Sequence, residues 1–325
     1  MNILVRNSEV GWLCDAVVAG RRLDERDALR LFQTSDLNAL GMLAREVTDR
    51  KVGRRATYIV NRYINYTNCC VLRCRFCSFA RSKGEPGAFE LTIDEIVAKA
   101  KEALDHGITE LHVVGGLHPT LPIEYYLDML KALKSLDPNL HLKCFTAIEI
   151  RHMADVAGMP MAKVLEKLRD AGLDCLTGGG AEIFEPRVRK VIAPGKETAE
   201  EWLEVHRTWH KLGGRSTCTM LYGHVESCAD RVDHLRRLRE LQSETGGFAG
   251  FVPLPYHPKN NALPAKTPPT GFDTLRTIAI SRLYFDNIDH ITAYWVGLGM
   301  KLAQVALNFG ADDLHGTIPV SYTHL

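Results

Sequence analysis

The sequence predicts an α/β fold, namely a (β/α) barrel of the TIM type with a helical extension in front of it. From Tyr58 onward, short β-rich runs alternate with amphipathic helical runs, which is typical of βα units around a parallel sheet. Polar and glycine residues follow nearly every predicted strand. Barrels carry their functional groups at that end, whereas an open sheet gathers them at one switch point. A chain of 325 residues also fits a single barrel.

The first fifty or so residues are predicted to be helical. Residues 24–32 and 35–47 place apolar side chains three and four positions apart, and Ser35 is a suitable N-cap. Neither segment carries a chemical motif. We therefore expect residues 1–55 to form a helical extension that covers the bottom or side of the barrel. The barrel itself is expected over residues 56–318, with residues 319–325 as an atypical tail.

The barrel region divides into about seven βα units, and the tail end of the chain is a candidate for an eighth strand. The predicted strands are 58–67, 108–116, 141–150, 174–184, 216–227, 248–258 and 290–299. The predicted helices are 91–107, 125–136, 161–172, 198–213, 230–247, 273–287 and 301–313. Thr92 with Glu95, and Thr198 with Glu201, are predicted capping boxes, and Gly107 is a natural end for its helix.

Composition and charge exclude several classes of function. The net charge of +1 gives no basic surface for nucleic acid or an anionic membrane. No apolar run approaches the roughly 18 residues of a membrane span, and the N-terminal residues lack the pattern of a signal peptide. We therefore expect a cytoplasmic protein whose thiols stay reduced. Its nine cysteines are clustered, which favours metal or redox chemistry over a disulfide framework.

Four of the nine cysteines lie in the segment NCCVLRCRFC, directly after the first predicted strand. Cys70, Cys74 and Cys77 stand as C-x3-C-x2-C, and three thiolates on a [4Fe-4S] cluster leave one iron without a protein ligand. Cys69 does not fit this spacing. The alternative is a structural zinc site, which is less favoured because such sites usually use two cysteine pairs. The remaining cysteines are expected to be small core or surface residues: Cys14, Cys144, Cys175, Cys218 and Cys228.

The cysteine spacing after the first barrel strand resembles the radical S-adenosylmethionine (SAM) superfamily. The resemblance implies that Cys70, Cys74 and Cys77 bind a [4Fe-4S] cluster. It further implies that SAM chelates the open iron, and that an electron from the reduced cluster cleaves SAM to methionine and a 5′-deoxyadenosyl radical. An electron donor such as flavodoxin or ferredoxin is implied as a partner, and a homodimer is left open.

Further stretches narrow the resemblance to the menaquinone and deazaflavin biosynthesis branch, within it to the aminofutalosine synthases. These stretches are GGLHPTLP, LKCFTAIEI, AEIF and AYWVGLG. The implied reaction adds the adenosyl radical to 3-[(1-carboxyvinyl)oxy]benzoate and gives 6-amino-6-deoxyfutalosine, methionine and CO2. SAM is then a consumed co-substrate.

Two neighbouring families remain alternatives. The cyclic dehypoxanthine futalosine synthases share the GGGAEI stretch and the LRELQ-x-ETGGF stretch, and the deazaflavin (F0) synthase subunit is also close. The residues IPVSYTHL after Thr317 do not resemble the ending of the family.

The candidate SAM-binding residues lie at the ends of the predicted strands. Gly115 and Gly116 match the superfamily position that binds the SAM amino group, although a plain βα turn would also explain them. The glycines before Glu182 suggest a close backbone approach. Glu182 would accept hydrogen bonds from the ribose or pair with a cation, unless it only begins a solvated turn. The remaining members of this candidate set are Thr146, Glu149, Gly179, Gly180, Tyr222 and His224.

The implied substrate carries two carboxylates, so donors are expected at the barrel mouth. His118 and His257 are the first candidates, with plain loop residues as the alternative, and Glu182 completes the predicted catalytic set. Arg282 would also reach a carboxylate, but a surface salt bridge is the favoured interpretation of that residue.

Overall fold

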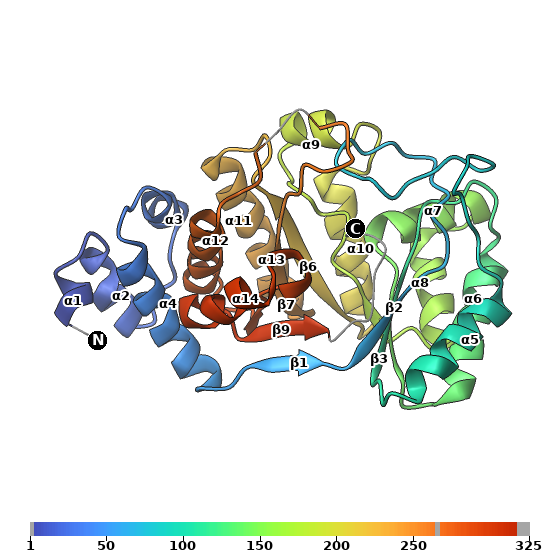
Figure 1. Cartoon of the computed structure of the whole chain (residues 1–325), viewed down its shortest axis with the longest axis horizontal. Helices are drawn as coiled ribbons and strands as arrows, with labels where there is room; N and C mark the ends of the chain where they lie inside the picture. The colour runs from blue at the N-terminus through green and yellow to red at the C-terminus, as the bar shows by residue number, and fades with distance from the viewer. Residues whose placement is uncertain (1–2, 264–266, 317–325) are drawn as a thin grey trace.

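The computed structural model describes residues 3–263 and 267–316, and it confirms the predicted α/β architecture. Seven parallel strands form one curved sheet in the order β2-β3-β4-β5-β6-β7-β8 (Figure 1). The strands are β2 (Asn61–Asn65), β3 (Glu110–Val114), β4 (His141–Cys144), β5 (Cys175–Leu176), β6 (Arg215–Tyr222), β7 (Phe248–Pro255) and β8 (His290–Ile291).

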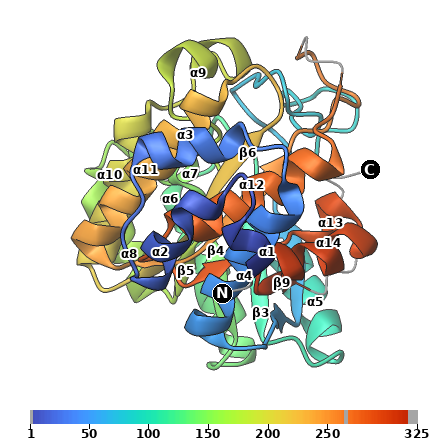
Figure 2. The ribbon, with the colours of Figure 1, turned by 90° about the vertical axis from the view of Figure 1, so that its left-hand side faces the viewer.

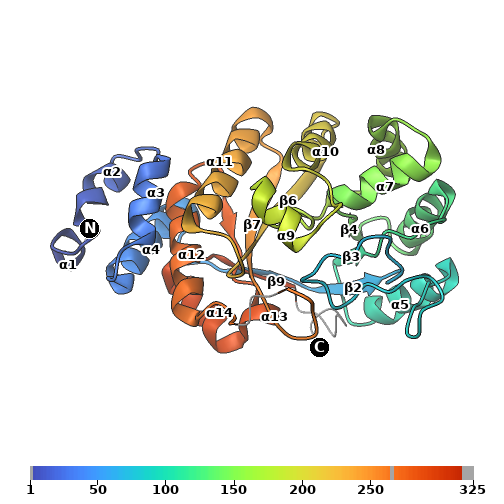
Figure 3. The same cartoon turned by 90° about the horizontal axis from the view of Figure 1, so that it is seen from above.

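Helices surround the outside of this sheet (Figure 3). The predicted helices are all present, as α5 (Ile93–Leu104), α6 (Ile123–Leu136), α8 (Met161–Asp170), α10 (Ala199–Lys211), α11 (Cys228–Thr245), α12 (Gly271–Tyr284) and α14 (Met300–Ala306). Both predicted capping boxes are confirmed, because Thr92 accepts from the Glu95 N–H and Thr198 accepts from the Glu201 N–H.

A separate pair of strands closes the gap between the two edges of the sheet. β1 (Thr57–Ile59) leads directly into β2 and pairs in parallel with β9 (Asp313–Gly316). β9 in turn reaches the end of β8, since the Ala293 N–H donates to the Asp313 carbonyl over 2.7 Å. The tail end of the chain thus supplies an additional strand, and the half-barrel of seven strands is bridged by β9 and β1.

The two faces of the sheet differ in chemistry. Ile64, Leu111, Val113, Leu142 and Leu176 are buried in the hydrophobic core that the strands share with the surrounding helices. Because side chains alternate along a strand, the neighbouring positions point to the inside of the curve. Several of these inward positions are polar, which sets the barrel interior apart from one packed with branched apolar residues.

The N-terminal helices form a group beside the barrel at the left of Figure 1, and they lie in front of it in the view of Figure 2. They are α1 (Ile3–Arg6), α2 (Cys14–Val18), α3 (Glu25–Phe32) and α4 (Leu37–Val52). α4 packs along α12, and α3 packs against α11 and α12. The predicted N-cap of α4 is wrong by one residue: Asp36 accepts from the Ala39 N–H, while the Ser35 hydroxyl donates to Glu9.

Three helices appear where the sequence pattern predicted strand or loop. They are α7 (Ala147–Ala157), α9 (Pro186–Ile192) and α13 (Trp295–Leu298). The predicted strand 141–150 is wrong in its second half, because Thr146 and Glu149 form a capping box that starts α7. Apolar residues at this position fit a buried helix as well as a strand, so periodicity alone could not separate them.

Arg282 is a buried structural residue rather than a surface cation, so the favoured surface salt bridge is wrong. Its side chain is fully buried on α12 and pairs with Asp312, and its guanidinium also donates to the Gly310 and Asp289 carbonyls, each over 2.8 Å. Asp312 additionally accepts from the Ile291 N–H over 2.8 Å. The pair therefore fastens α12 to β8 and to the segment before β9.

No helix among the described residues is long and apolar enough to cross a membrane.

Candidate active site

The cysteine loop lies above the C-terminal end of β2 and is fixed by backbone hydrogen bonds to three other segments. The Val71 N–H donates to the Leu117 carbonyl after β3 over 3.0 Å, and the Arg75 N–H donates to the Ile192 carbonyl at the end of α9 over 2.7 Å. The Arg75 carbonyl accepts from the Ala262 N–H after β7 over 2.7 Å. The loop is thus held over the mouth of the barrel by elements that are far apart in the sequence.

The three motif cysteines are free and lie within electrostatic reach of one another. Burial raises the pKa of the Cys74 thiol to about 11, with Lys196 acting in the opposite direction and with Cys77 and Cys70 adding to the rise. Cys69 is buried apart from them, and its sulfur lies 3.7 Å from the Phe89 carbonyl oxygen. Cys69 thus differs from the three motif cysteines in burial and in its neighbours.

Gly115 and Gly116 seat the cysteine loop on the end of β3. The Gly116 N–H donates to the Thr67 carbonyl over 2.9 Å, and a Cβ at Gly116 would overlap the carbonyl of Cys69. A Cβ at Gly115 would lie 2.6 Å from the ring of Tyr66. Neighbouring residues of the protein thus lie too close to both glycines for a larger side chain to fit, whether or not a ligand is bound.

Gly116→Ala is expected to lower the iron bound after reconstitution by more than half, because the Cys69 carbonyl and the loop behind it must move. Iron per chain, together with circular dichroism to confirm folding, measures this effect. Gly271→Ala is the matched control, since its added Cβ meets Leu302 at an ordinary distance of 3.5 Å and should leave the iron content unchanged. Full cluster loading in Gly116→Ala would show that the close contact between Gly116 and the Cys69 carbonyl is not needed to position the cysteine loop.

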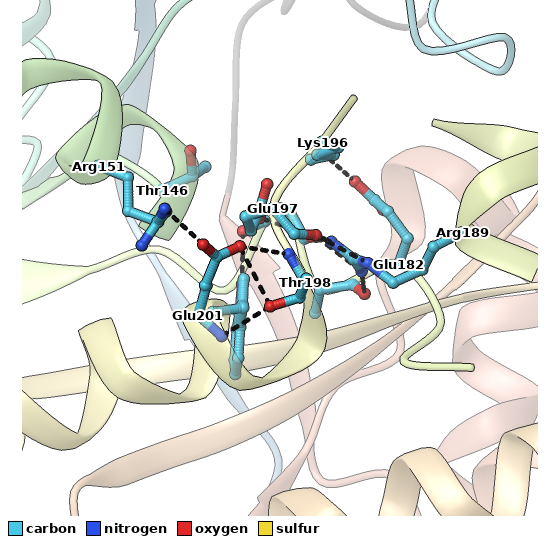
Figure 4. A network of polar contacts seen from close by, with 12 residues as sticks. Thr146, Arg151, Glu182, Arg189, Lys196, Glu197, Thr198 and Glu201 are labelled. Atoms are coloured by element: carbon cyan, nitrogen blue, oxygen red, sulfur yellow. Dashed lines mark hydrogen bonds and ion pairs between the residues drawn. The ribbon is translucent and has the colours of Figure 1, made fainter. Parts of the chain in front are cut away.

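The glycine-rich loop after β5 is held by hydrogen bonds from Arg189, which Figure 4 shows near Glu197, and from Trp202. The buried guanidinium of Arg189 donates to the Ala181 carbonyl over 2.6 Å, and the Trp202 indole N–H donates to the Gly179 carbonyl over 3.1 Å. Gly180 has a φ of +90°, and a Cβ there would lie 2.9 Å from a Glu197 carboxylate oxygen. The close backbone approach predicted for this loop is therefore made to neighbouring protein segments.

Glu182 forms a buried ion pair with Lys196 at the edge of the cysteine loop. The Lys196 Nζ donates to Glu182 Oε1 over 2.7 Å and lies 5.7 Å from the centre of the Phe76 ring. Burial lowers the pKa of Lys196, but attraction to Glu182 and to the Cys74 thiol outweighs burial, so the net shift is upward and the ammonium stays charged. Glu182 has a φ of +45°, an uncommon and strained value for a non-glycine residue.

Thr146 and Glu149 are engaged with the protein itself. Glu149 accepts from the Thr146 N–H and hydroxyl, from the Tyr66 hydroxyl over 2.8 Å and from the Gly115 N–H over 3.0 Å. Burial raises the pKa of Glu149, against these hydrogen bonds. The carboxylate thus ties together the ends of β2, β3 and β4.

The two histidines predicted to face the substrate differ in exposure. His118 is only 1% exposed, its Nδ1 accepts from the Thr120 N–H over 3.2 Å, and its Nε2 lies 2.8 Å from a Glu90 oxygen. Burial lowers the pKa of His118, while Glu90 opposes this shift. His257 is exposed after β7, and its Nε2 side lies near Gly297 of α13. Only His257 is open to solvent in this arrangement.

The side chains of Tyr222 and His224, which were predicted to bind SAM, make hydrogen bonds to other parts of the protein. Tyr222 points to the helical layer, where its hydroxyl donates to Thr274 of α12 over 3.0 Å, which does not favour the predicted role in binding the cofactor. His224 lies beyond the strand, and its Nδ1 accepts from the Val225 N–H over 2.7 Å while its Nε2 faces the Leu221 carbonyl. Both side chains are committed to protein partners.

Sequence reasoning missed a row of polar side chains on the inner face of the sheet. Tyr63, His112, Lys143 and Cys175 are neighbours across β2, β3, β4 and β5. The sequence does carry a signal for this row, because NRYIN, ELHVV and HLKC place polar residues at every second position. Parallel strands that are buried on both faces are usually continuous apolar runs, so this alternation indicates a polar interior.

A cavity of about 620 Å³ lies beside the cysteine loop. Its lining residues come from the cysteine loop, from the segment that leads to α5 and from the loop after β7, and they include Cys77, Arg81, Phe89 and Asn260. Its volume falls in the range of small-molecule sites.

Comparison with known protein families finds two matching regions in the chain. Residues 64–238, from β2 to α11, match the radical SAM superfamily. The chain belongs to the radical SAM superfamily. Residues 245–321 match the CofH/MqnC C-terminal region, and this region includes β7, β8 and β9 of the same barrel.

Two curated relatives and one solved structure give the degree of similarity. The radical SAM chain is 45% identical to the aminodeoxyfutalosine synthase of Thermus thermophilus, over 97% of this chain and 86% of the relative. It is 43% identical to the 5-amino-6-(D-ribitylamino)uracil--L-tyrosine 4-hydroxyphenyl transferase of Methanopyrus kandleri, over 94% and 84%. Methylornithine synthase has the same fold, with a TM-score of 0.73 at 20% identity over 96% of this chain and 88% of that chain.

Radical SAM proteins use a [4Fe-4S] cluster and SAM. The residues present fit this cluster, since three free thiols share one loop and their neighbour Lys196 would offset part of the negative charge of the cluster. In the described ranges, no three His, Cys, Asp or Glu side chains surround the position of a single metal ion. Because each thiolate of a cubane binds a different iron, a cluster does not require such convergence.

Proposed function

We propose that this radical SAM protein is an aminodeoxyfutalosine synthase that joins the 5′-deoxyadenosyl group of SAM to 3-[(1-carboxyvinyl)oxy]benzoate. The observation that carries this proposal is the 45% identity to the Thermus thermophilus enzyme over nearly the whole of both chains. The expected products are 6-amino-6-deoxyfutalosine, methionine and CO2. The sequence stretches quoted above point to the same reaction.

The proposed roles of the site residues follow from their positions. Cys70, Cys74 and Cys77 hold the cluster, which supplies one electron and an open iron for SAM. Lys196, which is paired with Glu182, lies against Cys74, where its positive charge favours the thiolate and the charge of Glu182 partly opposes this effect. Gly115 and Gly116 keep the loop close to β3, and their carbonyls are the proposed contacts of the SAM amino group. The cavity beside Cys77 offers space for a nucleoside-sized ligand.

Two further partners belong to this proposal. Cleavage of SAM consumes an electron, so a one-electron carrier such as flavodoxin or ferredoxin is the proposed donor. A second copy of the chain remains a predicted partner that the oligomeric state in solution would test.

A second candidate activity is the hydroxyphenyl transfer named for the Methanopyrus kandleri relative, which the 43% identity favours almost equally. The cyclase is the third member of the same group of alternatives. These activities differ in their products, because aminodeoxyfutalosine retains the adenosine carbons of SAM whereas the cyclase releases free 5′-deoxyadenosine.

Mass analysis of an anaerobic reaction tests the proposal. The cluster-loaded protein, SAM, dithionite and 3-[(1-carboxyvinyl)oxy]benzoate are expected to give one product that contains both the adenosine and the benzoate carbons. Cys74→Ala serves as the inactive control. Release of free 5′-deoxyadenosine without the joined product, or turnover only with tyrosine and the ribitylaminouracil, would reject the proposed reaction in favour of an alternative.

A further inference from the structure

The polar row inside the barrel contains a lysine, Lys143, that has no counter-charge among the described residues. Lys143 is 7% exposed on β4, and within residues 3–263 and 267–316 its ammonium has no hydrogen bond or ion pair with another group. An ammonium group in the barrel interior with no carboxylate beside it attracts an anionic ligand. A site of this kind is usually completed by an anion.

The groups around Lys143 also leave room for a hydrogen-bond acceptor. His112, the neighbour of Lys143 across the sheet, is 9% exposed, and its Nδ1 has no hydrogen-bond partner among the described residues. Burial and the charge of Lys143 hold the pKa of His112 well below its usual range, so the ring is neutral and offers one N–H. No carboxylate of the described chain comes within ion-pair distance of Lys143, and the buried Glu110 instead accepts from the Asn61 amide over 3.0 Å.

Aromatic rings extend this site on one side. Tyr63 stacks on His112 with ring centres 4.1 Å apart, and His315 of β9 approaches the Tyr63 hydroxyl at 3.4 Å. The ring of Tyr294 meets His315 edge-on at 5.1 Å. His315 also has a φ of +67°, which is strained for a non-glycine residue and is typical of functional positions.

We propose that Lys143, together with His112, binds a carboxylate of the substrate inside the barrel, with Tyr63, Tyr294 and His315 as the aromatic wall beside it. The ligand class is an aromatic or similarly flat carboxylate. The identification of this group as the benzoate carboxylate of 3-[(1-carboxyvinyl)oxy]benzoate rests on the proposed function.

The depth of the site suits that assignment. Tyr63 and His112 each lie two residues before the end of their strand, so the row lies about 7 Å below the strand ends that carry the cysteine loop. A substrate anchored there by its benzoate group would extend its vinyl ether toward the SAM side of the barrel.

Lys143→Met gives two readouts that together distinguish a ligand-binding lysine from a structural one. In the ligand-free, cluster-loaded protein, Tm is expected to stay within about 2 °C of the wild-type value, because no described group pairs with the Lys143 ammonium. With SAM bound and no reductant present, the Kd for 3-[(1-carboxyvinyl)oxy]benzoate in calorimetry is expected to rise about 10- to 100-fold. Lys143→Gln, which is neutral but polar, should weaken binding in the same way.

Lys131→Met is the matched control, because Lys131 is exposed on the outer helix α6 and should change neither value. A fall in Tm of more than about 2 °C or loss of folding in Lys143→Met, or substrate binding as tight as in Lys131→Met, would overturn the inference. Wild-type affinity in Lys143→Gln would do so as well.

Benzoate and its neutral analogue benzamide separate this inference from the proposed function. Benzoate is expected to raise the Tm of the wild-type protein but not that of Lys143→Met, and benzamide should raise neither. If no aminodeoxyfutalosine forms while this difference persists, the anion site stands and the proposed reaction fails. If the product forms but benzoate stabilises both proteins equally, the reaction stands and the anion site fails.

Discussion

Replacing Cys70, Cys74 or Cys77 by alanine is expected to abolish binding of the [4Fe-4S] cluster and all cleavage of SAM. Each substitution leaves only two of the three motif thiolates. Cys69, the nearest further thiol in the sequence, is buried, and its sulfur lies beside the Phe89 carbonyl. Iron and sulfide per chain after anaerobic reconstitution measure the loss.

Cys69→Ala is the control for these variants and should keep the cluster. It removes a neighbouring thiol of the same loop without touching the C-x3-C-x2-C spacing. A Cys69→Ala protein without a cluster, next to a Cys70→Ala protein with one, would show that the ligands are assigned wrongly by one residue.

Arg282→Met is expected to destabilise the protein by about 3 kcal/mol, because the buried Asp312 carboxylate then keeps only the half-exposed His290 ring as a charged neighbour. The variant also removes the hydrogen bonds to the Gly310 and Asp289 carbonyls, of which Gly310 keeps its bond from the Thr48 hydroxyl. Urea denaturation of the wild-type and variant proteins, followed by circular dichroism, measures the difference in the free energy of unfolding. The cysteine loop lies at the other end of the barrel, so cluster loading of the folded variant should be unaffected.

Arg276→Met supplies the comparison on the same helix. Its guanidinium makes one hydrogen bond, to the Thr34 carbonyl over 3.2 Å, so its loss should cost about 1 kcal/mol. The double variant Arg282→Met/Asp312→Asn should recover part of the stability lost in Arg282→Met, since the buried carboxylate that lost Arg282 is then replaced by a neutral amide. Equal destabilisation by Arg282→Met and Arg276→Met would refute the role given to the buried pair.

Local chemistry explains which elements could be predicted. The capping boxes at Thr92 and Thr198 depend on residues three positions apart, so the sequence shows them directly. The second half of 141–150 was mistaken for a strand because a short apolar run does not distinguish a buried helix from a buried strand. Tyr222 contacts Thr274, and His118 contacts Glu90. The members of each pair are far apart in the sequence, so no rule based on sequence spacing predicts these contacts.

The sequence alone determined the spacing of Cys70, Cys74 and Cys77 and the alternation of strands and helices, because both are properties of consecutive residues. Only the tertiary structure decided which side chains face one another across strands. It placed Lys143 next to His112, gave Arg282 a buried partner 30 residues away and closed the sheet with β9. Such pairings depend on strand register and on the curvature of the sheet, and these are set by the packing of the whole chain.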